Sequence, residues 1–214
     1  MADQQNNPYI PNVETESLDP DLCRLERVQD PAVIVIFGAT GDLTWRKLFP
    51  SLFALYQNQL LPENVCIVGT ARSRLSHDDF RDSMQRSVEP EPGREPMDWD
   101  GLSQRLFYHQ VSYDQEETFT SLKSFLDELD ATFATRGNRL FYLAVPPNVY
   151  PAIAHQLGRS GLAQEGGTRE NWVRFVVEKP FGHDLESARE LDTALHSSFA
   201  EHQIFRIDHY LAKE

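Results

Sequence analysis

The sequence predicts an α/β protein: a Rossmann-like, doubly wound, mostly parallel sheet of six strands with helices on both faces. Short runs rich in β-branched and aromatic residues alternate with amphipathic stretches along most of the chain, and this alternation is typical of such sheets. The first run is continuously apolar, as expected for a parallel strand that is buried on both faces. A turn with two glycines follows it directly.

The expected strands are short apolar runs that end at turn-forming residues; they cover residues 32–37, 65–68, 106–111, 139–145, 173–177 and 203–207. The expected helices carry apolar residues three or four positions apart; they cover 43–59, 76–88, 116–133, 148–159 and 185–195. Ser76 and Asp79 have the spacing of a capping box at the start of the second helix. The segments 89–100 and 164–170 are expected to be loops.

Length, composition and charge limit the possible functions. The 214 residues suit one folded domain, placed at 31–214, behind an acidic N-terminal tail at 1–30 that we expect to be disordered, with a short helix near 20–29. The formal net charge of -13 argues against nucleic acid or an anionic membrane as a partner. No apolar run reaches the ~18 residues of a membrane span, and the N-terminus does not resemble a signal peptide. The two cysteines, Cys23 and Cys66, indicate a reduced, cytoplasmic protein.

The turn after the first strand is a candidate phosphate-binding loop. It runs Gly38-Ala39-Thr40-Gly41-Asp42-Leu43-Thr44 and leads into the first expected helix. Gly38 permits a tight turn, Gly41 lets the backbone approach a pyrophosphate, and the N-terminus of the helix then faces the anion. Between a buried strand and an amphipathic helix, this pattern predicts a dinucleotide site.

The end of the second strand indicates which dinucleotide binds. Sheets of this type that bind NAD usually carry Asp or Glu there, which holds the ribose hydroxyls. This chain has Val68-Gly-Thr-Ala-Arg72-Ser-Arg74, without an acid. Two guanidinium groups near the position of a 2′-phosphate favour NADP, because arginine binds phosphate through two donors. The alternative is that both are solvated surface residues.

Two segments near the C-terminus predict a site for a phosphorylated sugar. Lys179 follows the fifth strand within Glu178-Lys-Pro-Phe-Gly182, at the sheet edge where such folds bind ligands. We expect the bond between Lys179 and Pro180 to be cis, because cis bonds mark tight turns at proline. After the sixth strand, a helix starting near Asp208 would place His209 and Lys213 on one face, as a phosphate grip.

Taken together, these segments resemble the glucose-6-phosphate dehydrogenase family. Six motifs occur in family order: Gly38–Leu43, Leu61–Asn64, Ala71–Arg74, Asn138–Ala144, Glu178–Gly182 and Arg206–Tyr210. The resemblance covers about residues 32 to 214. It implies the NADP-binding domain of an oxidoreductase of the pentose phosphate pathway, which oxidises glucose 6-phosphate at C1 to 6-phosphogluconolactone and forms NADPH.

The resemblance also implies roles for individual residues. NADP would be bound by Gly38, Ala39, Thr40, Gly41, Asp42, Leu43, Thr44, Trp45, Arg72 and Tyr150. Lys179 would contact both coenzyme and sugar, and Lys47 would approach the sugar. The substrate phosphate would be held by the segment His209, Tyr210, Leu211, Ala212 and Lys213. Asp208 would orient a proton-accepting His in a second domain, so that Lys179 and Asp208 are the candidate catalytic residues; no metal is implied.

The chain departs from the family pattern in two places. Ala212 stands where the family has Gly, and none of the seven His residues occupies the position of the proton-accepting His. Because hydride transfer from an alcohol needs a base for the hydroxyl proton, we expect this chain to bind coenzyme but to be inactive alone. Homo-oligomers are expected only in a full-length parent, and residues 207–214 are expected to be poorly anchored.

Two other functions fit parts of the pattern. A sugar dehydrogenase similar to glucose–fructose oxidoreductase would also pair a Rossmann domain with a Glu-Lys-Pro turn, although the Arg206–Glu214 segment and the Gly-Asp-Leu turn favour the first interpretation. A non-catalytic redox sensor that binds NADP would share the Gly-Ala-Thr-Gly turn but would lack a sugar-phosphate cluster.

Overall fold

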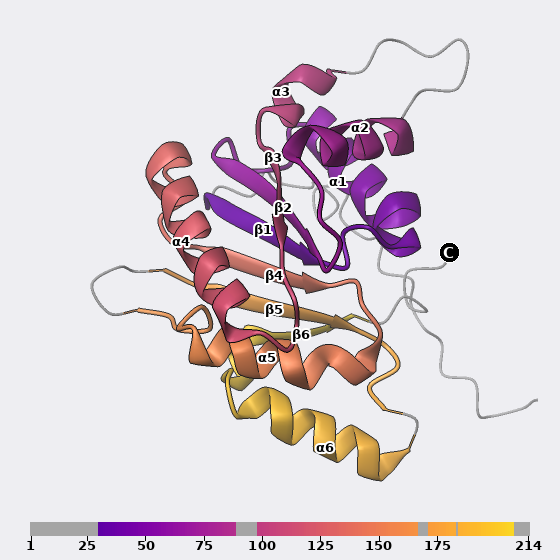
Figure 1. Cartoon of the computed structure of the whole chain (residues 1–214), viewed down its shortest axis with the longest axis vertical. Helices are drawn as coiled ribbons and strands as arrows, with labels where there is room; N and C mark the ends of the chain where they lie inside the picture. The colour runs from indigo at the N-terminus through magenta and orange to yellow at the C-terminus, as the bar shows by residue number, and fades with distance from the viewer. Residues whose placement is uncertain (1–29, 89–97, 167–170, 183, 208–214) are drawn as a thin grey trace, which may run out of the picture.

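Six strands form one parallel sheet in the order β3-β2-β1-β4-β5-β6 in the computed structural model, which describes residues 30–88, 98–166, 171–182 and 184–207 (Figure 1). The strands are β1 (Ala32–Phe37), β2 (Val65–Ala71), β3 (Leu106–Gln110), β4 (Arg139–Leu143), β5 (Val173–Glu178) and β6 (Ile204–Ile207). Every neighbouring pair is parallel, which confirms the predicted doubly wound sheet. The strand order reverses between β1 and β4, and ligands of such sheets bind outside the carboxyl ends of the strands at this switch point.

The helices also follow the prediction, with three local differences. They are α1 (Phe49–Gln57), α2 (His77–Val88), α3 (Trp99–Ser103), α4 (Glu116–Phe133), α5 (Tyr150–Arg159) and α6 (Leu185–His196), with short 3-10 turns at Pro147–Val149 and Glu201–Gln203. A π-helical turn, Thr44–Leu48, precedes α1. The loop expected at 89–100 ends where α3 begins at Trp99. The strand expected to continue to Val145 ends at Leu143, before Pro146 and Pro147.

The second strand is longer than expected, because Gly69 does not end it. β2 continues to Ala71 and is buried along its whole length. A Cβ at Gly69 would lie 2.3 Å from the Phe80 ring of α2. Glycine therefore lets α2 pack directly on the middle of β2 rather than marking a turn. The predicted capping box at the start of α2 is present, since Ser76 and Asp79 exchange hydrogen bonds.

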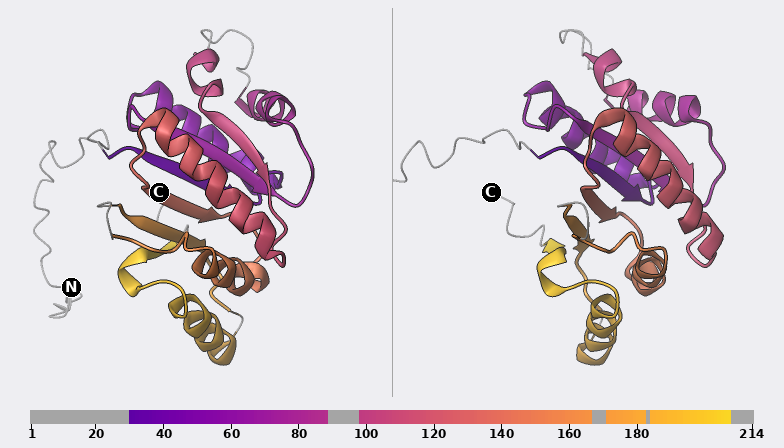
Figure 2. Two further views of the ribbon diagram at one scale, coloured as in Figure 1. Left: turned by 60° about the vertical axis from the view of Figure 1, so that its left-hand side comes forward. Right: turned by 90° about the vertical axis from the view of Figure 1, so that its left-hand side faces the viewer.

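Helices cover both faces of the sheet and enclose two apolar clusters (Figure 2). On one face, apolar side chains of α4, α5 and α6 pack on alternate residues of the strands, such as Val35, Phe37 and Phe141. On the other face, α1, α2 and α3 pack on Ile36 and Ile67. This division follows from strand geometry, because successive side chains point to opposite faces. No described helix is long and apolar enough to cross a membrane.

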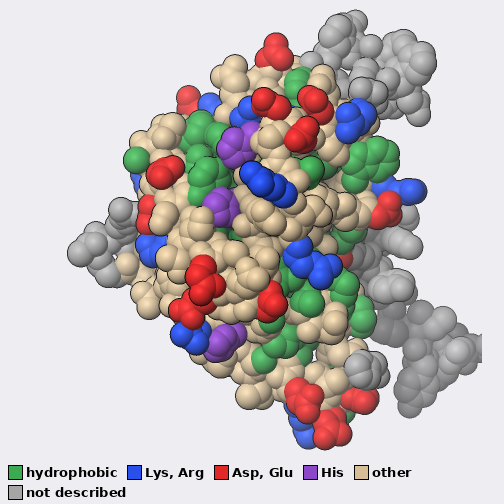
Figure 3. Space-filling view, viewed as in Figure 1, with side chains coloured by type: hydrophobic (Ala, Val, Ile, Leu, Met, Phe, Trp, Pro, Cys, Tyr) green, Lys and Arg blue, Asp and Glu red, His purple; other side chains and the backbone are tan. Residues whose placement is uncertain are grey.

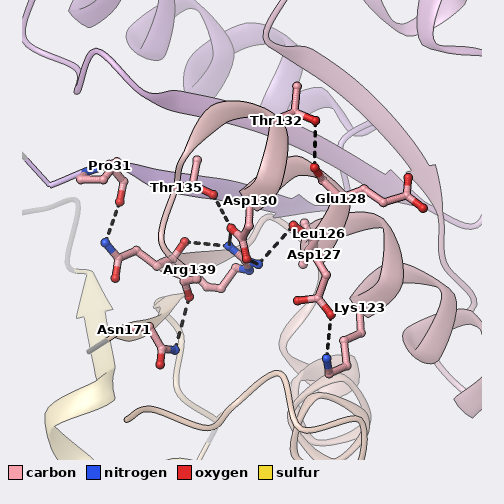
Figure 4. A network of polar contacts seen from close by, with 12 residues as sticks. Pro31, Lys123, Leu126, Asp127, Glu128, Asp130, Thr132, Thr135, Arg139 and Asn171 are labelled. Atoms are coloured by element: carbon pink, nitrogen blue, oxygen red, sulfur yellow. Dashed lines mark hydrogen bonds and ion pairs between the residues drawn. The ribbon is translucent and has the colours of Figure 1, made fainter. Parts of the chain in front are cut away.

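A buried ion pair joins α4 to the start of β4, at the amino edge of the sheet (Figure 4). The Arg139 guanidinium donates to both carboxylate oxygens of Asp130, at 2.7 and 2.5 Å, and Thr135 donates to the same carboxylate. Burial would raise the pKa of Asp130, but the donors from Arg139 and Thr135 lower it below its usual value. Beside this pair, Asn138 donates to the Pro31 carbonyl at 2.7 Å and accepts from the Trp172 amide at 3.0 Å. The network fixes the amino ends of three neighbouring strands.

Charged side chains do not gather in one field on the face of the molecule that Figure 3 shows. On the face seen in Figure 3, acidic and basic side chains are interspersed, and a group of acidic side chains lies where α6 is located in Figure 1. The negative net charge therefore does not prevent local binding of an anion where cations are placed, because exposed charges beyond about 10 Å are screened at ordinary salt concentrations.

Candidate site at the carboxyl edge of the sheet

The loop after β1 is held tightly between its two neighbouring strands. The amides of Gly38 and Ala39 both donate to the Thr70 carbonyl of β2, at 2.9 and 3.0 Å. Gly38 has a φ of +86°, and a Cβ there would lie 2.2 Å from the Ala144 carbonyl oxygen, just after β4. Glycine is thus required twice, for the left-handed backbone and for the close approach to the β4 side. The predicted Gly38 turn lies at the switch point between β1 and β4.

The rest of the loop turns into a helix whose first turn faces outward. The Gly41 amide donates to the Gly38 carbonyl at 2.9 Å, and the buried Thr44 hydroxyl donates to the same oxygen at 3.1 Å. Thr40 and Asp42 are exposed, as are Trp45 and Lys47 on the π-helical turn. The amides at the start of a helix lack partners within it and suit an anion. Short π-helical segments are also frequent at functional sites.

Arg72 and Arg74 follow β2 with exposed side chains and a fixed main chain. The Gln110 side-chain amide donates to the Arg72 carbonyl at 2.8 Å, and the Tyr108 hydroxyl donates to the Ser73 carbonyl. Within the described part of the chain, neither guanidinium is paired with a carboxylate. The structure therefore presents both arginines to solvent beside the Gly38 loop, ready to bind an anionic group.

Sequence reasoning missed two components of this region. Tyr113 lies after β3, stacks edge-on against Phe37 with ring centroids 6.1 Å apart, and has its hydroxyl near the Gly38 main chain and Arg72. Burial raises the pKa of Tyr113, partly offset by Arg72 and the Gly38 main chain. No local pattern marks this residue, because its position depends on β2 pairing with both β1 and β3.

The second missed component is a polar cavity of about 620 Å³ between the Gly38 loop and α2. Its lining is Ala39, Thr40, Ser73, Leu75, Asp79, Phe80, Asp82, Ser83, Met84 and Arg86. Apolar and polar groups from the loops after β1 and β2 and from α2 meet there. A flat aromatic base with an attached ribose needs this combination of packing and hydrogen bonding.

Lys179 begins the turn after β5, as predicted, with its side chain exposed. The bond between Lys179 and Pro180 is cis, which confirms the prediction. The Lys179 amide donates to the Ile207 carbonyl of β6 at 3.3 Å. Gly182 closes the turn with a φ of +99°, where a Cβ would lie 2.6 Å from the Ala188 amide nitrogen of α6. The turn is therefore tied to both β6 and α6.

An apolar groove of about 870 Å³ lies beside this turn. It is lined by Pro147, Asn148, Pro151, Pro180, Gly182, Ser187, Glu190, Leu191 and Ala194. The residues come from the turn before α5 and the start of α5, from the Lys179 turn and from one face of α6. The groove extends the candidate site along the carboxyl edge of the sheet.

Tyr150 occupies a different setting from the one expected for a coenzyme contact. It is the first residue of α5, its side chain is only 1% exposed, and its hydroxyl lies against the main chain of Glu178. Burial raises the pKa of Tyr150. Its predicted contact with NADP remains a prediction.

The remaining candidate residues, Asp208, His209, Tyr210, Leu211, Ala212 and Lys213, lie outside the described residues, as do the expected tail, the helix near 20–29 and most of the loop 164–170. The structure does describe the strand that leads to them. Arg206 of β6 binds Asp192 of α6 at 2.7 Å and Glu201 at 2.8 Å. Among the described residues, no group of three or more His, Cys, Asp or Glu side chains is placed to hold a metal ion.

Comparison with known proteins gives consistent matches. Residues 35–214 match the family model described as "Glucose-6-phosphate dehydrogenase, NAD binding domain". Glucose-6-phosphate 1-dehydrogenase of Chlamydia muridarum is 44% identical over 188 residues, which are 86% of this chain and 37% of that protein. Glucose-6-phosphate 1-dehydrogenase 2 of Mycobacterium tuberculosis is 44% identical over 194 residues, 89% of this chain and 37% of that protein.

The fold agrees with these relatives as well. A solved glucose-6-phosphate dehydrogenase in complex with its substrate glucose-6-phosphate has a TM-score of 0.76 and 38% identity, and the match covers 88% of this chain and 38% of that one. A glucose-6-phosphate 1-dehydrogenase from Mycobacterium avium has a TM-score of 0.70 and 32% identity, and covers 85% and 37%. The chain thus spans little more than a third of the length of these relatives.

Proposed function

The chain belongs to the glucose-6-phosphate dehydrogenase family, and from this premise we propose that it binds NADP and glucose 6-phosphate along the carboxyl edge of its sheet. In the proposed reaction a hydride leaves C1 of the sugar for the nicotinamide ring, and the C1 hydroxyl loses its proton to a base. The products are 6-phosphogluconolactone and NADPH. This chain supplies the coenzyme site and part of the sugar-phosphate site.

One observation carries the proposal: the Gly38 loop, Arg72 and Lys179 follow β1, β2 and β5 at the same edge of one parallel sheet. A dinucleotide crossing the switch point would place its pyrophosphate on the loop and its adenosine over β2, with the nicotinamide toward β4 and β5. The cavity lined by Thr40, Ser73 and Leu75 has the position expected for the adenosine. Lys179 then lies beyond the nicotinamide, where a sugar oxygen would be held.

The proposed preference for NADP rests on the two exposed arginines after β2. A 2′-phosphate beside Arg72 would receive charge-assisted hydrogen bonds, which NAD cannot accept. No carboxylate within the described residues neutralises either guanidinium. The chain on its own is proposed to bind without measurable turnover, since no His described here is assigned as the base for the C1 hydroxyl.

The test is coenzyme binding to an Arg72→Ala variant, measured by calorimetry. We expect the free energy of NADP binding to weaken by about 1–3 kcal/mol, as for loss of a hydrogen bond to a charged group, with NAD binding nearly unchanged. Arg189→Ala on the exposed face of α6 is the matched control and should affect neither coenzyme. Equal losses for NAD and NADP would show that Arg72 does not contact a 2′-phosphate.

A second titration, with glucose 6-phosphate in the presence of NADP, separates the proposed enzyme from a redox sensor. Saturable binding of the sugar phosphate, weakened by Lys179→Ala, supports the dehydrogenase site. If NADP binds normally but glucose 6-phosphate does not bind up to millimolar concentrations, the sugar site is wrong and a sensor is favoured.

A further inference from the structure

Glu178, the residue immediately before Lys179, is held by two tyrosines. The Tyr142 hydroxyl donates a short hydrogen bond to the Glu178 Oε1 atom. The Tyr150 hydroxyl lies against the Glu178 main chain. The two phenols are also close enough to influence one another electrostatically.

The two tyrosines reach Glu178 from different elements. Tyr142 belongs to β4 and pairs in register with Val176, two residues before Glu178 on β5. Because residues two apart on a strand share a face, Tyr142 and Glu178 project from the same face of the sheet. Tyr150 begins α5 and belongs to the apolar cluster on the opposite face, with Phe141 and Leu143. Tyr142 thus holds the Glu178 carboxylate on one face of the sheet, and Tyr150 lies against the Glu178 main chain on the other face.

The hydrogen bond offsets the cost of partly burying the Tyr142 hydroxyl and the Glu178 carboxylate. Tyr142 and Glu178 are half-buried, and burying a polar group costs free energy unless it is hydrogen-bonded. Burial raises the pKa of Tyr142, and the bond to Glu178 raises it further, so the phenol stays protonated and remains a donor. The bond therefore holds the Glu178 carboxylate in one position beside Tyr142.

The position of Glu178 affects Lys179, the next residue along the chain. The residue leaves the sheet at the end of β5 with its amide bound to Ile207, and the turn ends at Gly182 against α6. The main chain is therefore anchored on both sides of Lys179, at Glu178 and at Gly182. We propose that Tyr142 and Tyr150 are positioning residues that fix Glu178 and thereby direct the Lys179 ammonium toward the bound coenzyme and sugar.

The proposal rests on the proposed function, because it takes Lys179 as a contact of the ligands. It assigns Tyr150 a role through Glu178 instead of a direct side-chain contact with coenzyme, in agreement with its 1% exposure. Neither tyrosine hydroxyl touches the ligands in this account. Both act on the orientation of a residue that does.

The first experiment compares NADP binding by the wild-type chain, Tyr142→Phe, Lys179→Met and the double variant. We expect Tyr142→Phe to weaken binding on the order of 10-fold, as for loss of a hydrogen bond to a charged group. If Tyr142 acts through Lys179, the double variant binds no more weakly than Lys179→Met, because residues acting through one another are non-additive. Fully additive losses, or unchanged binding by Tyr142→Phe, overturn the proposal.

Two controls separate positioning from general damage. Tyr56→Phe removes a phenol that packs with the α1 and α2 cluster and should leave NADP binding unchanged. Glu178→Gln retains an acceptor for Tyr142 and should keep most of the affinity, whereas Glu178→Ala should lose as much as Tyr142→Phe. Equal losses for Gln and Ala would contradict the hydrogen-bond role. Circular dichroism and thermal unfolding show whether each variant is folded.

A measurement without coenzyme tests the positioning proposal separately from the proposed function. Carboxyl carbons of glutamate are labelled with ¹³C, and the chemical shift of the Glu178 carboxyl is compared at one pH in wild type and Tyr142→Phe. Loss of the Tyr142 donor should change this shift, whereas glutamates far from Tyr142 should keep theirs. If the wild-type chain does not bind NADP, the proposed function fails; if the Glu178 shift is the same in both proteins, the positioning proposal fails.

Discussion

At the scale of single residues, Gly38 carries the most specific constraint in the site. It combines a φ of +86° with a carbonyl oxygen 2.2 Å from where a Cβ would lie. Gly166 has a similar φ, +79°, but no atom within 4 Å of its Cβ position. The two glycines therefore share a backbone conformation and differ in the space available, which makes them a matched pair for substitution.

We expect Gly166→Ala to lower the free energy of unfolding by about 1–2 kcal/mol, the cost of a left-handed backbone for an L-residue. Gly38→Ala should cost more, because the loop must also move away from Ala144, and NADP binding should be lost with it. Urea unfolding and calorimetric titration of both variants provide the measurements. Retained coenzyme affinity in Gly38→Ala would show that the loop does not hold the pyrophosphate.

Tyr113 and Tyr142 could not be identified from the sequence, and the reason is physical. The glycines, Arg72 and Lys179 are marked by their positions directly after strands. Tyr113 and Tyr142 acquire their partners only when particular strands become neighbours. Side chains whose contacts are set by the strand order cannot be assigned from local spacing.

At the scale of elements, the edge strand β3 depends on a neutral imidazole. The Tyr108 amide of β3 donates to the Nδ1 atom of His77, at 3.0 Å. His77 and His109 both stack on Phe125 of α4, with ring centroids 6.0 and 5.1 Å away. Burial lowers the pKa of His77, with a further contribution from Arg81, and burial also lowers the pKa of His109, assisted by His77.

The lowered pKa values of His77 and His109 determine how their contribution to stability changes with pH. Unfolded histidines titrate near a pKa of about 6.5, above the lowered pKa values of the folded protein, so the unfolded state binds protons first as the pH falls. The contribution of these two histidines to the free energy of unfolding therefore declines as the pH falls from about 7 to 5. His77→Asn, which keeps an acceptor near the Nδ1 position, should make this decline shallower in urea unfolding series.

His196 is the control with the opposite sign. Its pKa is raised by the Asp192 carbonyl and by Glu201, so it contributes stability below the unfolded pKa and loses this contribution as the pH rises. His196→Gln should therefore make the decline on acidification steeper. Identical pH profiles for wild type and His77→Asn would contradict the account of β3.

The elements themselves were predictable to different degrees. Helix α4 has the same bounds as the sequence predicted, Glu116–Phe133, because its apolar residues follow one face over five turns. The π-helical turn at Thr44–Leu48 was not predictable, since one widened turn hardly changes the spacing of apolar residues. The sequence gives no sign that Gly69 belongs to β2, because the reason for glycine there is the Phe80 ring of α2, which packs against it.

At the scale of the whole molecule, coenzyme binding should stabilise the fold by mass action. NADP at 100 times its Kd adds about 2.7 kcal/mol to the free energy of unfolding, which corresponds to a rise in Tm of roughly 5–10 °C for a domain of this size. Thermal unfolding with NADP and with NAD checks this. No shift with saturating NADP would exclude specific binding to the folded state.

The buried Asp130–Arg139 pair and Asn138 lie at the amino edge of the sheet, whereas the Gly38 loop, Arg72 and Lys179 lie at the carboxyl edge. The strands keep these two sets of residues apart, and substitutions that are far apart tend to be energetically independent. Replacing Arg72 by an acid, to favour another coenzyme, would therefore leave the Asp130–Arg139 pair and the Asn138 hydrogen bonds unchanged. For engineering, the fold thus offers ligand contacts that can be exchanged while the residues that hold the amino ends of the strands stay unchanged.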